Sequence, residues 1–240
     1  MINNESSELI STYIAAPFGN YIHTNNTKSV RGSFTLYKRK GLIKQILKTL
    51  RYSNGSWYNS IGLRNPGIEF GLKKYRKNKK EILSLAAIES DDWSILSEIV
   101  PDDVDVELNL SCPNIKHFEN YTQGIEKFLT NQRKVIVKIS PTFEQKEIEK
   151  LINTGFTSIH CCNTFLTDKG GQSGKILYPY VIKIIDILKS LNISNLEIIA
   201  GGGIENKTDI KRYLDHGANG ISLGTVCFNP YKLYKILMER

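Results

Sequence analysis

Apolar and polar residues alternate strictly in one stretch near the middle of the chain. They follow one another in the order Val104, Asp105, Val106, Glu107, Leu108, Asn109, Leu110 and Ser111. A period of two is typical of a β-strand, and Pro113, which has no backbone N–H, should end it. If the apolar set faces covering helices, Asn109 and Cys112 lie inward near the carboxyl end of the strand. In a parallel α/β barrel that end carries the active site, although an ordinary polar turn would show the same residues.

Short apolar runs and stretches of helical spacing alternate along the rest of the chain. Leu42, Ile46 and Leu50, for example, have the spacing of one helix face. Strands are expected at residues 14–17, 32–36, 82–88, 104–111, 135–141, 158–163, 196–200 and 220–225. Helices are expected at residues 42–50, 67–75, 91–99 (capped by Asp91), 123–129, 143–153 (ended by Gly155), 180–191, from Asn206 or Thr208 to 214, and 230–238. About eight strands separated by helices predict an α/β protein with the (β/α)8 architecture of a TIM barrel.

The composition indicates one soluble globular domain. The chain has 240 residues, of which 40% are hydrophobic and 23% charged. We expect residues 1–10 to form a polar arm and residues 11–240 to form a single barrel domain. No apolar run approaches the roughly 20 residues that cross a bilayer, and the start shows no basic region followed by an apolar one. We therefore expect no membrane partner, no signal peptide and a cytoplasmic location.

The spacing of the cysteines and the net charge indicate which ligands and binding partners the chain is expected to have. Cys112, Cys161, Cys162 and Cys227 show neither disulfide nor zinc spacing, so we expect no metal site and a reducing compartment, with Cys161 and Cys162 as buried thiols. The formal net charge is +8, and the densest basic cluster is residues 73–80. A polyanion could bind such a chain. The lysines are spread along a chain that is also rich in Asn and Ile, as an AT-rich coding sequence would give, so we do not expect a nucleic-acid partner.

Two glycine-rich turns follow the last two predicted strands, at residues 200–204 and 222–226. Barrels often bind phosphate in the loops after strands seven and eight. Glycines let backbone N–H groups approach an anion, and a helix that follows would add positive potential at its N-terminus. Two tight turns without a ligand would look the same, but the combined position favours a phosphate site.

Lys138 lies in the middle of a predicted strand, on the face that also carries Ile136 and Ser140. Both faces of a barrel strand are covered, so this lysine needs an anionic partner. One candidate is Glu107 on the neighbouring strand. The other is a ligand that becomes anionic, such as a reduced flavin, whose pyrimidine edge gains negative charge when hydride arrives.

Four asparagines lie at strand ends or just after them: Asn59, Asn109, Asn114 and Asn163. A single asparagine at such a place would be explained by the frequency of asparagine in turns. Four asparagines around one open end of the barrel would suit a planar ligand with imide or amide groups, since the Asn side chain offers both a hydrogen-bond donor and an acceptor. His160, by contrast, lies in the middle of a strand and is interpreted as a packed core histidine.

Several motifs together resemble those of dihydroorotate dehydrogenases, from about Ala16 to the C-terminus. They are Asn-Ser-Ile-Gly-Leu with Asn-Pro-Gly (59–63, 65–67), Asn-Leu-Ser-Cys-Pro-Asn (109–114), Val-Lys-Ile-Ser-Pro (137–141), Cys-Asn-Thr (162–164), Gly-Gly-Gln-Ser-Gly-Lys (170–175), Ala-Gly-Gly-Gly-Ile (200–204) and Ser-Leu-Gly-Thr (222–225). The resemblance implies an FMN-containing (β/α)8 barrel that oxidises dihydroorotate to orotate in pyrimidine (UMP) biosynthesis. It also implies an unidentified electron acceptor and suggests a homodimer.

The resemblance assigns roles to individual residues. Cys112 matches the active-site base of the soluble class, which takes the C5 proton while the C6 hydride passes to flavin N5, and Lys138 matches the lysine that contacts the flavin ring. The positions that match substrate contacts are Asn59, Ile61, Gly62, Leu63, Asn109, Asn114, Asn163 and Thr164. The positions that match flavin or phosphate contacts are Asn109, Lys138, Gly174, Gly202, Gly203, Gly224 and Thr225.

The chain departs from the family pattern in two ways. The family usually has a lysine on the second strand that touches flavin and substrate, whereas Gly32 occupies the aligned position here and Arg31 lies beside it. Arginine cannot simply copy the compact charge of lysine. The loops after Cys112 and between Asn163 and Gly174 are also short, which leaves the substrate and the exclusion of water open.

Three other functions remain open at this point. A tRNA dihydrouridine synthase-like flavoenzyme also pairs FMN with a Cys near an Asn-x-x-Cys-Pro turn, and the positive charge would suit RNA. A barrel that binds flavin or phosphate but has lost dihydroorotate turnover through the Gly32 change is another alternative. A cofactor-free phosphate-sugar barrel would leave Lys138 and the asparagines without a role.

Overall fold

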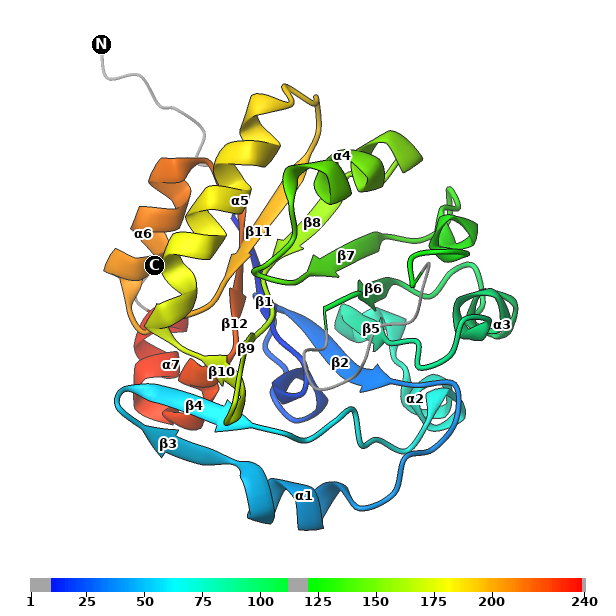
Figure 1. Ribbon diagram of the computed structural model, residues 1–240, viewed down its shortest axis with the longest axis horizontal. Coiled ribbons are helices and arrows are strands. Elements are labelled where there is room, and N and C mark those ends of the chain that lie inside the picture. The colour runs from blue at the N-terminus through cyan, green and yellow to red at the C-terminus, as the bar shows by residue number, and fades with distance from the viewer. Residues whose placement is uncertain (1–9, 112–120, 239–240) are drawn as a thin grey trace.

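The chain folds into a closed barrel of eight parallel strands surrounded by helices (Figure 1). The computed structural model describes residues 10–111 and 121–238. The barrel strands are β1 (Ser11–Ile14), β2 (Lys28–Phe34), β5 (Glu81–Leu85), β6 (Val106–Asn109), β7 (Val135–Ile139), β8 (Ser158–Cys161), β11 (Glu197–Gly201) and β12 (Gly220–Leu223). Each strand pairs with the barrel strands that precede and follow it in the sequence, and β12 closes the ring onto β1. The predicted (β/α)8 architecture is confirmed.

The described residues form seven α-helices outside the barrel, of which α1 lies beside β4 (Ser56–Asn59) of a second sheet (Figure 1). They are α1 (Leu42–Thr49), α2 (Ile68–Lys74), α3 (Asp92–Ile99), α4 (Gln145–Thr154), α5 (Tyr178–Ser190), α6 (Lys207–His216) and α7 (Pro230–Met238). Short 3₁₀ helices are η1 (Phe18–Asn20), η2 (Lys77–Lys79), η3 (Ile125–Phe128), η4 (Lys175–Leu177) and η5 (Thr225–Phe228). The helix predicted at 123–129 is shorter than expected, because only the four residues of η3 are helical and they form a 3₁₀ turn.

Local side chains fix where the helices begin and end. Glu144 and Glu147 form a capping box at the start of α4, and Gly155, at a φ of 110°, ends that helix as predicted. The Asn206 side chain accepts the N–H of Asp209 and starts α6. The prediction that Asp91 caps α3 was wrong, since its side chain makes no cap hydrogen bond.

A second sheet, which the sequence patterns did not predict, adjoins the carboxyl ends of the barrel strands. It is antiparallel, in the order β3 (Arg51–Ser53), β4 (Ser56–Asn59), β10 (Gly170–Ser173) and β9 (Phe165–Thr167). The first four residues of the Gly-Gly-Gln-Ser-Gly-Lys motif at 170–175 are strand β10. β9 begins four residues after β8 ends, which places the sheet beside the barrel mouth (Figure 1). The shortened connection between Asn163 and Gly174 is the β9–β10 hairpin.

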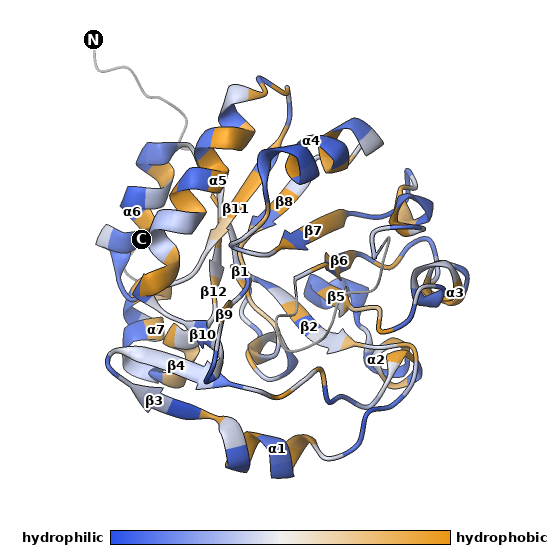
Figure 2. Cartoon of the chain, viewed as in Figure 1, coloured by the Kyte–Doolittle hydropathy of each residue, from blue (hydrophilic) through white to orange (hydrophobic). Residues whose placement is uncertain are grey.

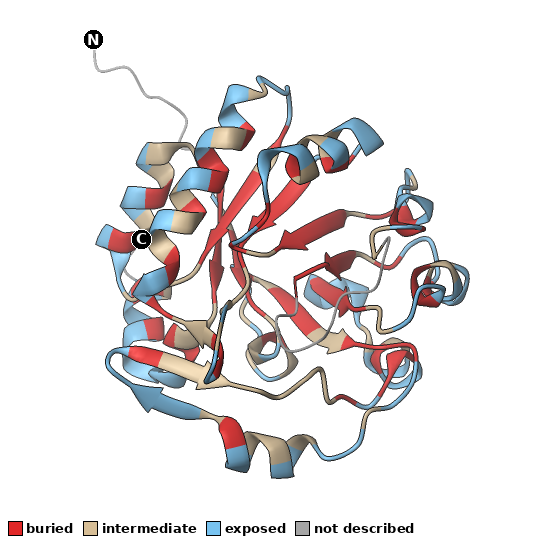
Figure 3. Cartoon of the chain, in the orientation of Figure 1, coloured by how far each residue is buried: buried red, intermediate tan, exposed pale blue. Residues whose placement is uncertain are grey.

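Apolar side chains form two cores. The larger core lies between the strands and the helices, and it includes Val106 and Leu108 of β6. Figure 3 shows that the barrel strands are largely buried whereas the helices have exposed outer faces, and Figure 2 shows hydrophobic positions along the strands and helices. A smaller cluster fills the barrel interior with Tyr13, Val30, Ile82, Ile136 and Ile199. The predicted faces of β6 are confirmed, because its apolar residues belong to the outer core whereas Glu107 bonds to other strands across the interior. Within the described ranges, no helix is both long and apolar enough to span a bilayer.

Candidate active site

Three polar residues on neighbouring strands meet inside the barrel near its carboxyl end. In the strand register, Asn109 of β6 lies opposite Lys138 of β7, which lies opposite His160 of β8. Glu107 precedes Asn109 by two residues and therefore faces the same side. Lys138, His160 and Glu107 are only 6%, 3% and 1% exposed. Such buried polar groups need specific hydrogen-bond or charge partners.

Glu107 is held by hydrogen bonds from two sides. Its Oε1 accepts the Ser84 hydroxyl at 2.9 Å, and its Oε2 lies 2.7 Å from Nδ1 of His160. Burial by itself would raise the pKa of Glu107, but the charge of Lys138 and these hydrogen bonds lower it to about 2. Burial lowers the pKa of His160 in spite of its bond to Glu107. Glu107 is therefore ionised and His160 neutral, which agrees with a core histidine but gives it a defined partner.

The pKa of Glu107 predicts how stability depends on pH. The folded value of about 2 lies below the ordinary value of 4.5, so the carboxylate stabilises the fold above pH 4.5 and this contribution is lost as the pH falls from 4.5 to 2. At 1.36 kcal/mol per pKa unit, the contribution at neutral pH is on the order of 3 kcal/mol. In urea unfolding at a series of pH values, the free energy of unfolding of Glu107→Gln should be well below that of wild type at pH 7 and approach it near pH 3. Glu98→Gln, at an exposed position, should have the wild-type free energy at every pH. A difference between Glu107→Gln and wild type that does not change with pH would contradict the lowered pKa of Glu107.

Lys138 has no anionic partner within ion-pair distance in the described part of the chain. Glu107, one of its two predicted partners, is bonded to Ser84 and His160 instead and feels the lysine charge only over a longer distance. Nor does any hydrogen bond of a described residue involve its ammonium. A buried ammonium with free donors can serve a ligand that carries or develops negative charge.

Two of the predicted asparagines meet beside Lys138. Nδ2 of Asn163 lies 3.4 Å from Oδ1 of Asn109 and donates to the backbone oxygen of Ser111 at 2.9 Å. Nδ2 of Asn109 donates to the hydroxyl of Ser33 at 2.9 Å. Ser33 was not predicted as a site residue, and its position at the end of β2 was the one signal that could have indicated it. Cys112 and Asn114 lie outside the described residues.

The other predicted substrate residues lie on a different segment. Asn59 ends β4 and pairs with Gly171, while its side chain accepts only the N–H of Ile61 among the hydrogen bonds of the described chain. The segment that follows, Ile61, Gly62 and Leu63, is half-buried, as is Thr164 after β8. No hydrogen bond joins Asn59 to Asn109 or Asn163 in the described structure.

Asn65 anchors this second segment to the barrel. Its Oδ1 accepts the backbone N–H groups of Thr35 and Gly67, and its Nδ2 donates to the Thr35 hydroxyl and the Leu63 oxygen. Asn65 is buried, so these four bonds tie the loop firmly to the end of β2. The motif Asn-Pro-Gly therefore has a structural role that its position in the sequence does not reveal.

The two glycine turns lie on neighbouring strands, since β11 pairs with β12. Among the described residues, the N–H groups of Gly202, Gly203 and Gly224 donate no backbone hydrogen bond. A Cβ at Gly224 would meet only the Ala15 Cβ, at 4.0 Å, so open space lies beside this turn. Gly203 packs against Gly174 and Lys175, which brings the predicted Gly174 to the same place.

The turns differ from the prediction in one respect, because neither glycine turn opens directly into an α-helix. α6 begins at Lys207, four residues after Gly203, and Thr225 starts only the short η5. The free N–H groups and the open space fit an anionic group such as a phosphate without help from a helix dipole.

Arg31 does not replace the missing family lysine. Its Nη1 donates to Glu81 at 3.0 Å and to the backbone oxygen of Lys74 at 2.6 Å, and the side chain is 6% exposed. Val30, its neighbour in β2, faces the barrel interior, so Arg31 faces the surrounding helices. No cation from β2 therefore reaches the mouth at this position.

Gly32 cannot carry a side chain on this backbone. Its φ is 110°, and a Cβ would lie 2.6 Å from the Ser84 oxygen and 2.8 Å from the Phe34 nitrogen. Restoring the family lysine by Gly32→Lys should therefore lower the stability by at least about 2 kcal/mol and should not increase activity. Gly55→Ala is the matched control, because Gly55 also has a positive φ of 73° but no atom near its Cβ position. Thermal unfolding of both variants checks this, and equal losses would refute the steric argument.

Two further features lie apart from this site. Cys161, Cys162 and Cys227 are buried free thiols, as predicted for the first two, and burial raises the pKa of Cys162 to about 12.

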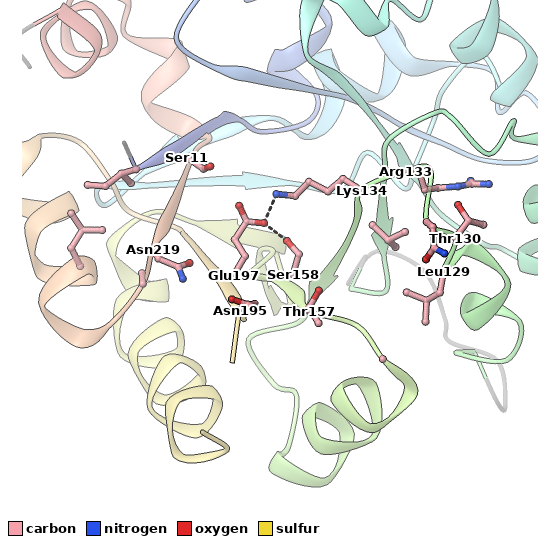
Figure 4. A pocket seen from close by; sticks show the side chains of 16 residues that line it. Ser11, Leu129, Thr130, Arg133, Lys134, Thr157, Ser158, Asn195, Glu197 and Asn219 are labelled. Carbon is pink, nitrogen blue, oxygen red and sulfur yellow. Dashed lines mark hydrogen bonds and ion pairs between the residues drawn. The ribbon is translucent and has the colours of Figure 1, made fainter. Parts of the chain in front are cut away.

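A cavity of about 1040 Å³ opens at the other end of the barrel, beside the first residues of β1, β7, β8 and β11 (Figure 4). There Glu197 forms an ion pair with Lys134 at 2.5 Å and accepts the Ser158 hydroxyl (Figure 4). This cavity contains none of the predicted site residues.

A parallel barrel that gathers oriented amides and a lysine without an ion-pair partner among the described residues at its carboxyl end is an enzyme scaffold suited to a planar, electron-rich ligand. The chain belongs to the dihydroorotate dehydrogenase family, whose family model matches residues 19–239. It is accordingly an oxidoreductase of the kind that acts on CH–CH bonds.

Individual relatives agree with this assignment. The chain is 32% identical over 208 residues to "Dihydroorotate dehydrogenase B (NAD(+)), catalytic subunit" of Brachyspira hyodysenteriae, which covers 72% of this chain and 67% of the relative. It is 28% identical over 241 residues to the protein of the same name from Staphylococcus carnosus, covering 82% and 78%. The fold is similar to the crystal structure of DHODH in complex with ferulenol from Eimeria tenella, with a TM-score of 0.73, 18% identity, and coverage of 98% and 84%.

Proposed function

We propose that the protein oxidises dihydroorotate to orotate with FMN as its cofactor, as a step in pyrimidine biosynthesis. The observation that carries the proposal is Lys138, a residue only 6% exposed that lies opposite Asn109 and has no ion-pair partner in the described chain. The family of the chain supports the same reaction.

The residues at the mouth fit FMN. The free N–H groups of Gly202, Gly203 and Gly224, with the open space beside Gly224, suit the phosphate group, and Lys138 suits the ring. When bound, FMN supplies the chemistry of hydride acceptance at its N5 atom. Lys138 would stabilise the negative charge that develops near its ammonium.

The remaining roles belong to the substrate side. Asn109 and Asn163 would fix the orientation of the dihydroorotate ring through their amide groups. Cys112, which directly follows the described Ser111, would take the C5 proton as a thiolate. This role comes from the family resemblance, and in the sequence Cys112 follows Asn109 by three residues.

An absorbance spectrum followed by anaerobic addition of dihydroorotate tests the proposal. A yellow protein that bleaches would support both cofactor and substrate. A yellow protein that does not bleach would leave a flavin-binding barrel without dihydroorotate turnover. A colourless protein that takes up no added FMN would overturn the cofactor assignment, and the glycine turns would then need another phosphate ligand.

A further inference from the structure

One continuous chain of hydrogen bonds runs from the barrel interior to the asparagine pair at the mouth. His160 Nδ1 and Glu107 Oε2 are 2.7 Å apart, and Glu107 Oε1 accepts the Ser84 hydroxyl at 2.9 Å. The Ser84 and Ser33 hydroxyl oxygens are 2.8 Å apart, and Ser33 accepts Nδ2 of Asn109 at 2.9 Å. The chain crosses β8, β6, β5 and β2 and returns to β6, so it depends on the closed barrel and not on local sequence.

The carboxylate at the inner end determines the direction of every bond. An ionised carboxylate only accepts hydrogen bonds, so the Ser84 hydroxyl must donate to Glu107. The Ser84 oxygen is then the acceptor for the Ser33 hydroxyl, and the Ser33 oxygen is the acceptor for an amide N–H of Asn109. Ser84 is fully buried and Glu107 is 1% exposed, so water has little access to replace their hydrogen-bond partners.

The same direction continues into the mouth. With Nδ2 of Asn109 committed to Ser33, Oδ1 of Asn109 accepts the Ser111 hydroxyl at 3.1 Å and faces Nδ2 of Asn163. Nδ2 of Asn163 also donates to the Ser111 backbone oxygen. The Asn163 carbonyl oxygen therefore has no hydrogen-bond donor in the described structure. An amide can usually rotate by half a turn to exchange its donor and acceptor. Here Ser33 at Nδ2 and the Ser111 N–H at Oδ1 hold the Asn109 amide, and the Ser111 backbone oxygen holds the Asn163 amide.

We propose that Ser33, Ser84 and Glu107 are positioning residues, which hold Asn109 and Asn163 so that the site presents a fixed carbonyl acceptor to the ligand. Such a site selects a ligand whose edge donates an N–H at that place, as a cyclic imide does. The inference rests on the proposed function for the identity of the ligand, dihydroorotate or orotate. It adds residues that act through the asparagines and do not touch the reacting atoms.

A double-mutant cycle in orotate binding tests the proposal. Ser33→Ala and Ser84→Ala should each raise the Kd of the FMN-loaded protein for orotate about tenfold, the equivalent of one hydrogen bond. The double variant should be no weaker than either single variant, because both cut the same chain. Ser33→Thr keeps the hydroxyl and should bind within about twofold of wild type. Additive losses, or wild-type affinity in Ser84→Ala, would overturn the proposal.

A measurement without substrate separates this inference from the proposed function. With ¹⁵N-labelled asparagine, the side-chain amide protons of Asn109 should exchange slowly with solvent in wild type and in Ser33→Thr. They should exchange at least about tenfold faster in Ser84→Ala, although Ser84 is joined to Asn109 only through the Ser33 hydroxyl in the hydrogen-bond chain. If wild type binds no orotate but shows this pattern, the proposed function fails and the positioning chain stands. Unchanged exchange in folded Ser84→Ala would refute the chain even in an active enzyme.

Discussion

Replacing Cys112 by alanine should slow reduction of the bound cofactor by dihydroorotate by a factor of about 10² to 10⁴, the usual contribution of a general base. The variant should still bind FMN and orotate, because the glycine turns, Lys138 and the asparagine pair do not include this residue. Anaerobic stopped-flow absorbance separates the two effects, since binding and reduction change the flavin spectrum differently.

The pH dependence of the same rate identifies the group as a thiol. A free thiol has a pKa near 8.5, so the wild-type rate should rise through neutral pH unless the site lowers that value. Cys112→Ala should lose this rise. Cys161→Ala is the matched control, because Cys161 is a fully buried thiol in the outer core and should affect stability but not the rate. Reduction of Cys112→Ala at the wild-type rate would show that another group takes the proton.

The barrel could be predicted from the sequence because each strand carries its own signal. The alternation at 104–111 identifies the inward and outward faces of β6, and the structure places Val106 and Leu108 in the outer core as expected. The inward position of Lys138 could be predicted for the same reason, since Lys138 follows Ile136 by two residues and Ile136 lies in the barrel interior. These inferences use only neighbours in the sequence and the period of two.

The second sheet and Ser33 could not be predicted in this way. β3 and β9 have only three residues each, too few for any hydrophobic period to appear, and β4 meets β10 from more than a hundred residues away. Ser33 gains its role from Ser84 and Asn109, which come from two other strands. The orientation of Arg31 likewise depends on Glu81 of β5, which no pattern around Arg31 contains.

Replacing Lys138 by methionine should have the second large effect, on both the reaction and the fold. Loss of one preorganised charged donor typically slows a reaction by about 10² to 10³, and here it would remove the cation beside which negative charge develops. The variant would also leave Glu107 buried without the charge that lowers its pKa. That carboxyl pKa should rise, and the free energy of unfolding should fall by about 3 kcal/mol.

Two companion variants distinguish these effects. Lys134→Met removes a half-buried lysine that pairs with Glu197 at the opposite end of the barrel, so it should lower stability but leave cofactor reduction unchanged. In the double variant Lys138→Met with Glu107→Gln, no buried carboxylate remains uncompensated, so stability should recover in part while the rate of reduction stays low. The single variant Glu107→Gln is the reference, because Glu107 also orients the asparagine pair. If the double variant reduces the cofactor as fast as Glu107→Gln alone, Lys138 serves only to neutralise Glu107. If the double variant is slower than Glu107→Gln alone, the ammonium acts on the ligand itself, as its lack of an ion-pair partner among the described residues predicts.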